Sequence, residues 1–235
     1  IEPMANTLMQ TNYSLQAAVT QLLSSLHFYD EDDGIKGDTL WGAKVKDPLE
    51  LSLGIFRQFA VVIPNYDTQH VSNHQFFNSR IFSRLGRLDL PFWRPFDVSG
   101  YPPHSKDPQY DRTWITPITL SARYTDFIDA LITGYTHTNV RIQLDTVLFV
   151  RNSGFFSDPA DADKLLNEFY DMLFVARPQG GRHTYFREAL LGGLSIINWR
   201  NDWNNYLATN NKNTVKVALD RLVKTLLKSI EYQAS

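Results

Sequence analysis

Apolar residues recur at every third or fourth position along much of this chain, the spacing of helices that bury one face. One such set predicts a helix from Ser14 to His27 with a buried face, made of Leu15, Val19, Leu22, Leu23 and Leu26. A second helix is expected to begin after Asp47, because Asp47 and Glu50 have the spacing of a capping box, and to end at Pro64.

The same spacing predicts further helices downstream. They cover residues 74–88, 116–134, 158–173 and 185–191, the segment that carries Trp199, Trp203 and Tyr206, and residues 215–230. Val140, Ile142 and Leu144 alternate as in a short strand, although residues 145–150 fit a helical turn equally well. We therefore predict a mainly α fold, an irregular bundle of about seven or eight helices with at most a short strand pair.

The helical pattern stops between Asp89 and Asp111. Five of the eleven prolines lie in this stretch, and proline fixes φ and removes a backbone donor, so neither a helix nor a central strand can form. Aromatic residues accompany the prolines, which argues against disorder. We predict a long, proline-rich, ordered loop.

This loop and the helix after it hold the candidate binding residues. The set combines aromatic rings with charged groups that could hold a ligand or partner: Trp93, Arg94, Phe96, Tyr101, Trp114 and Arg123. Rings in such a loop more often form its own small core than a binding surface. Arg123 lies in an otherwise apolar helix, so it is expected either to be buried against Asp97 or Asp126 and anchor the loop, or to face solvent.

No catalytic constellation is evident. Glycoside hydrolysis needs two carboxyl groups about 5 to 10 Å apart, and the weak nominees for acid–base roles are Asp97, His104, Asp107 and Asp111. Solvated loop carboxylates are the more common case. His70 and His74 have helical spacing but lack an evident third ligand, so no metal site is predicted, and no glycine-rich nucleotide motif is present, so no cofactor is expected.

Composition narrows the class of protein without adding a site. The chain has 235 residues, is 43% hydrophobic and carries a net charge of −2, which is typical of a globular domain and provides no electrostatic surface for nucleic acid. No stretch approaches the roughly 18 to 20 apolar residues of a membrane span. We expect a single helical domain over residues 1–235, with any subdomain seam near residues 134–158; the oligomeric state is not predicted.

Several segments resemble the carboxyl-terminal half of a bacterial family known only as domain of unknown function 1800. They are Leu23–Tyr29, Lys46–Leu51, Leu85–Leu88, Arg94–Pro102, Trp114–Thr116 and Leu120–Tyr124. The chain departs from the family pattern at Asp97 and Tyr101, where Asn and Trp are expected. The resemblance implies that the chain is the carboxyl-terminal part of a longer protein, that this protein is exported from the cytoplasm, and that no activity or site is established for the family.

Two classes of function fit these observations. The first is a non-catalytic binding or assembly module for a protein or glycan partner, which would use the proline-rich loop and the segment with Trp199, Trp203 and Tyr206. The alternative is a hydrolase that acts on an extracellular polysaccharide or similar polymer through loop carboxylates. We favour the first class, because helices and a rigid loop suit a docking surface.

Overall fold

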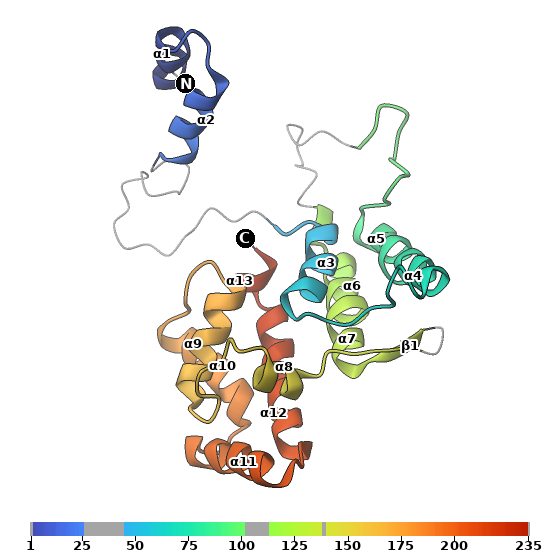
Figure 1. Cartoon of the computed structure of the whole chain (residues 1–235), viewed down its shortest axis with the longest axis vertical. Helices are drawn as coiled ribbons and strands as arrows, with labels where there is room; N and C mark the ends of the chain where they lie inside the picture. The colour runs from blue at the N-terminus through green and yellow to red at the C-terminus, as the bar shows by residue number, and fades with distance from the viewer. Residues whose placement is uncertain (1, 26–44, 102–112, 138–139, 235) are drawn as a thin grey trace. The chain divides into compact units, whose positions relative to one another are not determined.

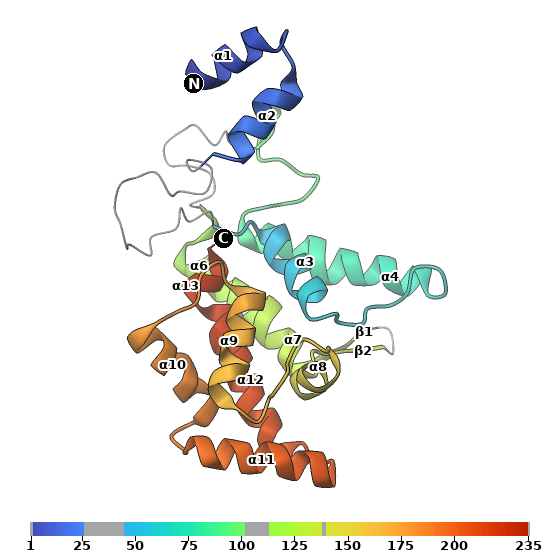
Figure 2. The same cartoon turned by 60° about the vertical axis from the view of Figure 1, so that its left-hand side comes forward.

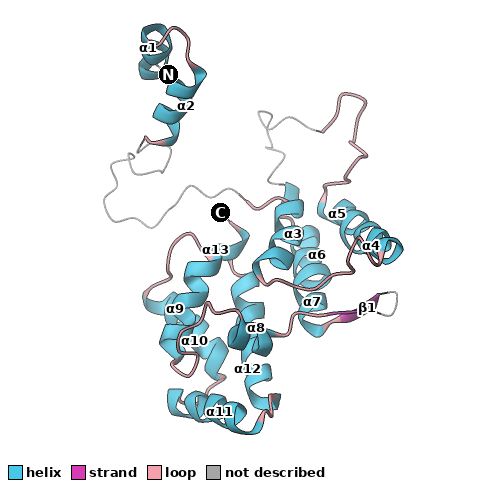
Figure 3. Cartoon of the chain, in the orientation of Figure 1, coloured by secondary structure: helices cyan, strands magenta, loops and turns pink. Residues whose placement is uncertain are grey.

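The computed structural model describes residues 2–25, 45–101, 113–137 and 140–234 (Figure 1). The chain divides into two compact units, residues 1–43 and 44–235. Helices dominate, and the strands among the described residues form a single hairpin (Figure 3). The mainly α fold predicted from the sequence is confirmed, while the segment 134–158 lies inside the second unit.

The first unit holds two short helices, α1 (Glu2–Gln10) and α2 (Leu15–Leu23), which contact each other. The sequence predicts that the apolar face of α2 is buried, but the first unit by itself does not cover this face: the exposed fractions are 74% for Leu15, 50% for Val19, 37% for Leu22 and 45% for Leu23. The two helices have nine residues each, too few to cover such a face, and Ala18 is the one buried residue of α2. Leu26 lies outside the described residues.

The second unit contains the other helices and the hairpin. In chain order they are α3 (Pro48–Gln58), α4 (His70–Phe76), α5 (Ser83–Leu85), α6 (Pro117–Ala122), α7 (Ala130–Thr133), β1 (Tyr135–His137), β2 (Val140–Ile142), α8 (Thr146–Asn152), α9 (Ala162–Leu173), α10 (Gly180–Leu191), α11 (Ile196–Thr209), α12 (Asn213–Lys228) and α13 (Ile230–Gln233).

Two of the predicted helices contain wider turns than the apolar spacing reveals. The π-helical segment η2 (Phe77–Phe82) joins α4 to α5, and the short 3₁₀ segment η3 (Gly86–Leu88) follows. A second π-helical segment, η5 (Arg123–Asp129), joins α6 to α7. Since π-helical turns are rare and occur often at functional sites, both segments direct attention to the proline-rich region that lies between them in the chain.

The central helix of the second unit is α12. It contacts α8, α10, α11, α13 and η5 (Figures 1 and 2). Its buried positions follow the predicted helical spacing: Val215, Leu219, Leu222, Val223, Leu226 and Leu227. Ile230, which the sequence places on the same apolar face, is 74% exposed because α12 ends at Lys228.

The start of α3 follows the local sequence signal. The Asp47 carboxylate accepts hydrogen bonds from the N–H groups of Leu49 and Glu50 at 2.7 Å each, and the Glu50 carboxylate accepts one from the Asp47 N–H at 3.1 Å. The predicted capping box is therefore confirmed. The helix ends at Gln58, before the expected Pro64, because Ala60 adopts a left-handed φ of 47°.

Residues 135–152 contain both structures that the sequence left open. The strands β1 and β2 pair in antiparallel register, with Tyr135 opposite Ile142. Asp145 then caps α8 by accepting a hydrogen bond from the Leu148 N–H at 3.1 Å. None of the described helices combines the length and apolarity that a bilayer span requires.

Candidate functional site

The proline-rich segment leaves the helices directly after η3. Asp89 takes a φ of 58°, and the Leu90 N–H donates to the Leu85 carbonyl at 3.0 Å, which closes the preceding helix. Phe92 then lies against Phe82 of η2, with ring centroids 5.3 Å apart and planes 3° from parallel. This stacked pair attaches the first part of the loop to the helices.

Residues 91–101, here called the aromatic loop, are closed by internal hydrogen bonds. The Tyr101 hydroxyl donates to the Pro91 carbonyl at 2.7 Å, which joins the two ends of the loop. Within it, the Gly100 N–H donates to the Asp97 carbonyl at 3.0 Å and forms a tight turn. The loop is thus an ordered excursion without regular secondary structure, as the sequence predicts for its described part.

The aromatic loop exposes large apolar side chains. Trp93 is 80% exposed, Phe96 56% and Tyr101 37%, while Val98 is fully exposed. Phe92, which is half-buried against Phe82, fits the interpretation that loop rings form a small core. Trp93 and Phe96 also contact neighbouring rings, Phe92 and Tyr101, but most of their surface remains exposed.

The charged candidates of the loop are exposed as well. Both Arg94 and Asp97 are exposed, and the Asp97 carboxylate accepts a hydrogen bond from the Val98 N–H at 2.6 Å. The other three nominees for acid–base chemistry, His104, Asp107 and Asp111, lie outside the described residues. Of the four nominated groups, the described part of the loop therefore contains only Asp97.

Arg123, the first residue of η5, is fully buried. Its Nε donates to the Trp114 carbonyl at 3.2 Å, and its Nη1 donates to the Lys46 carbonyl at 3.1 Å and to Gln233 Oε1 at 3.3 Å. Nη2 also donates to the Lys46 carbonyl in a short hydrogen bond. Burial lowers the pKa of Arg123 to about 10, although the negative charge of the Asp47 carboxylate opposes this shift.

The structure thus confirms burial of Arg123 and corrects its predicted partners. Its hydrogen bonds go to two backbone carbonyls and a side-chain amide, whereas Asp126 forms an ion pair with Arg87 at 2.6 Å. Asp97 instead bonds to the backbone of its own loop. Arg123 holds together Trp114, which follows the proline-rich region, the start of α3 and the carboxyl-terminal helix α13.

The tryptophan-bearing segment is not a surface. Trp199, Trp203 and Tyr206 of α11 are 3%, 2% and 1% exposed, and their rings contact one another in sequence. The Trp199 indole N–H donates to the Pro159 carbonyl at 3.0 Å. These three rings therefore provide no exposed surface for a partner, because helical spacing directs all of them into the core.

The histidine pair lies on a helix that begins four residues before the start predicted from the sequence, His74. His70 and His74 are both in α4, and the His74 ring lies 5.7 Å from that of Tyr66. Across the described residues, no group of three His, Cys, Asp or Glu side chains could hold a metal ion.

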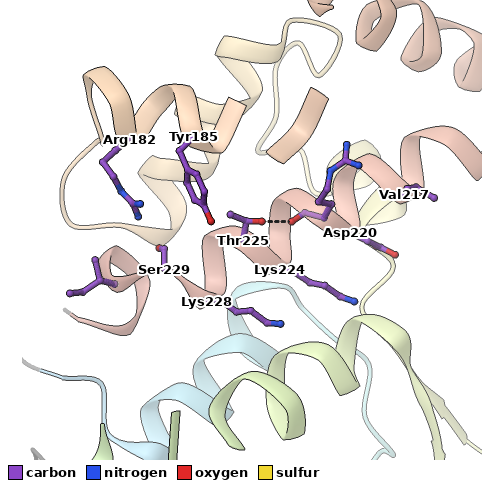
Figure 4. A pocket seen from close by; sticks show the side chains of 10 residues that line it. Arg182, Tyr185, Val217, Asp220, Lys224, Thr225, Lys228 and Ser229 are labelled. Carbon is purple, nitrogen blue, oxygen red and sulfur yellow. Dashed lines mark hydrogen bonds between the residues drawn. The ribbon is translucent and has the colours of Figure 1, made fainter. Parts of the chain in front are cut away.

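A basic groove, which the sequence analysis missed, lies on α10, α12 and α13 (Figure 4). It is lined by Arg182, Tyr185, Val217, Asp220, Arg221, Lys224, Thr225, Lys228, Ser229 and Ile230, and its volume is about 740 Å³. A signal for one wall exists in the sequence, since Lys216, Asp220, Lys224 and Lys228 recur at four-residue intervals and therefore share one helix face. The second wall, from α10, requires the tertiary fold.

The fold and these sites define a mainly α-helical domain that carries an exposed aromatic loop and a basic groove. Residues 1–234 match the family described as "Protein of unknown function (DUF1800)", and the chain belongs to this family. The match covers nearly the whole chain and does not single out a carboxyl-terminal half. Comparison with curated proteins and with solved structures gives no match.

Proposed function

We propose that this domain is a non-catalytic binding module that docks a protein partner through the aromatic loop. The proposal rests on one observation: Trp93, Phe96 and Val98 are exposed on a loop whose shape is fixed by its own hydrogen bonds. Exposed apolar groups on an ordered support are typical of interaction sites. Because the loop is already ordered, binding would require little further loss of conformational entropy.

The composition of the loop favours a protein partner. Tryptophan, tyrosine and arginine are the residue types that contribute most often to binding energy at protein interfaces, and Trp93, Arg94 and Tyr101 supply all three. An interface centred on Trp93 would bury a side chain that is now 80% exposed.

The ring geometry supports the same choice over a glycan. Trp93 is inclined by 69° to Phe92, and Phe96 by 89° to Tyr101, so neighbouring rings stand edge to face. Neither pair forms a continuous flat platform for successive sugar rings, whereas a protein groove can accept rings and the Val98 side chain from several directions. Export from the cytoplasm, which the family resemblance implies, is part of the proposal.

The test places a photo-crosslinking phenylalanine analogue at Phe96 in the producing bacterium. We expect a discrete covalent adduct with one protein, identified by mass spectrometry, and loss of this adduct when Trp93→Ala is added. The matched control carries the analogue at Leu207 on α11, which is 49% exposed, and should give no such adduct. Trp93→Ala should change the unfolding free energy by no more than about 0.5 kcal/mol, because its side chain lies mainly in solvent.

Three results would contradict the proposal. Equal adducts from positions 96 and 207 would show that the loop contacts other proteins no more than an exposed position on α11 does. Retention of the domain on a glycan array, abolished by Trp93→Ala, would replace the protein partner by a carbohydrate, and release of reducing sugars lost in Asp97→Asn would favour the hydrolase alternative.

A further inference from the structure

The basic groove has the size of a binding site for a small molecule. Its volume of about 740 Å³ falls within the range of roughly 300 to 1,000 Å³ that ligand pockets occupy. Figure 4 shows Tyr185 directed from α10 toward Thr225 of α12, whereas Lys224 and Lys228 project from α12 on the side away from α10, toward Asp129 of η5, so the groove extends across α12. The site uses no residue of the aromatic loop, so it stands independently of the proposed docking function.

Positive charge predominates in the groove although the whole chain has a net charge of −2. Four lining residues are cationic and one is anionic: Arg182, Arg221, Lys224 and Lys228 against Asp220. Inclusion of their ion-pair partners Lys216, Asp129 and Glu231 still leaves five cations and three carboxylates. A local excess of this kind concentrates small anions.

Existing contacts position these cations to different degrees. Arg182 is held by Glu231 through two hydrogen bonds of 2.7 Å, and Lys228 pairs with Asp129 at 2.7 Å. Lys224 lies 3.8 Å from the same Asp129, a much weaker contact. Its ammonium group therefore retains N–H groups that can donate hydrogen bonds to an anionic ligand.

Arg221 adds positive charge by a different route. Its Nε donates to the Ala189 carbonyl at 2.5 Å and its Nη2 to the Leu190 carbonyl at 2.9 Å, at the end of α10. Within the described residues, no carboxylate lies at ion-pair distance from Arg221. Its charge is balanced only by the partial negative charge of a helix terminus.

The uncharged part of the groove suits an apolar ring. Tyr185 is 53% exposed, and Val217 and Ile230 are 64% and 74% exposed. The Arg182 guanidinium lies 5.1 Å from the centroid of the Tyr185 ring, so a cation and an aromatic face are adjacent. A ligand with a charged end and a ring would contact both kinds of surface.

We propose that the groove between α10 and α12 binds a small phosphate or sulfate monoester carried on a ring. The ester oxygens accept hydrogen bonds from Lys224 and are attracted by the Arg182, Arg221 and Lys228 charges. The ring packs against Tyr185. Clustered lysines and arginines favour tetrahedral oxyanions, which present several acceptor oxygens at once.

Isothermal titration of the full chain with phenyl phosphate, and separately with phenyl sulfate, tests the proposal in phosphate-free buffer of low ionic strength. We expect at least one ester to bind with a Kd of about 1 mM or tighter. Lys224→Gln should weaken binding by about fivefold, since one partly screened charge contact is lost. Lys164→Gln, on the exposed side of α9, is the matched control and should leave the Kd unchanged.

A second variant tests the ring contact separately. Tyr185→Ala should weaken phenyl phosphate and leave inorganic phosphate unaffected, and circular dichroism of both groove variants checks that they fold. Saturation by neither ester below about 10 mM would overturn the proposal. An equal loss in Lys164→Gln would also overturn it, because the attraction would then belong to the surface as a whole.

Discussion

Replacement of Arg123 by methionine should destabilise the domain strongly, because its guanidinium is the donor for buried acceptors from three parts of the chain. The Trp114 carbonyl keeps a donor in the variant, since the Thr119 hydroxyl also donates to it at 3.0 Å. The Lys46 carbonyl and Gln233 Oε1 lose the guanidinium donor. Each unsatisfied buried acceptor costs about 1–3 kcal/mol.

The two acceptors together set the expected size of the effect. Their cost is offset in part because methionine, unlike arginine, needs no stabilisation of a buried charge. The net loss in unfolding free energy should be about 2–4 kcal/mol. Arg123→Lys should recover only part of it, because one ammonium group cannot reach three acceptors that a planar guanidinium spans.

Urea unfolding followed by circular dichroism measures this loss. Arg200→Met on the exposed face of α11 is the control, with an expected change within about 0.5 kcal/mol. Chymotrypsin cleavage after Trp93 and Phe96 provides a second measurement, and it should be faster in Arg123→Met if the anchor positions the loop. Stability equal to that of Arg200→Met, with unchanged cleavage, would refute the reasoning.

Three further predictions concern stability alone. Burial lowers the pKa of Lys46 from its ordinary value of 10.5 to about 8. Between these pH values the unfolded chain binds more protons than the folded chain. The unfolding free energy therefore rises with pH from about 8 to 10.5. The unfolding free energy of the native chain should therefore rise relative to that of Lys46→Met over this pH window, and a relative fall would contradict the prediction. Gly192→Ala should cost about 1 kcal/mol more than Gly154→Ala in thermal unfolding, because only the Cβ at position 192 would displace the Arg221 guanidinium from the Ala189 and Leu190 carbonyls, while both glycines have positive φ. Asp161→Ala should lower stability by about 1 kcal/mol, because the carboxylate caps α9; an unchanged melting temperature would argue against the cap.

Local signals in the sequence predict where many helices begin. The capping residues Asp47 and Thr116, each followed by a proline, mark the starts of α3 and α6 correctly. These signals work because a cap depends on residues within one turn of each other. For α9 the sequence predicts a start at Asp158, whereas the capping residue is Asp161.

The burial and the contacts of individual side chains are harder to predict, because they depend on elements that are distant in the sequence. Phe92 and Trp93 are adjacent and similar, yet Phe92 stacks on Phe82 while Trp93 is 80% exposed. The sequence indicates Arg123 as a candidate anchor, but its carbonyl acceptors have no sequence signature, since every residue has a carbonyl. The groove escaped prediction for the same reason: the spacing within α12 is visible in the sequence, but the position of Tyr185 across from it is not.

The contacts of the aromatic loop distinguish residues that fix its position from residues whose side chains are largely exposed. Phe92 touches the helices at one end, and Arg123 holds Trp114 beyond the other, so substitutions at Phe92 and Arg123 should impair both stability and docking. Trp93 is 80% exposed, so its substitution should affect docking far more than stability. Such a division is expected of a binding surface selected for its exposed groups, since a loop that served only to cover the core would lose stability at every ring.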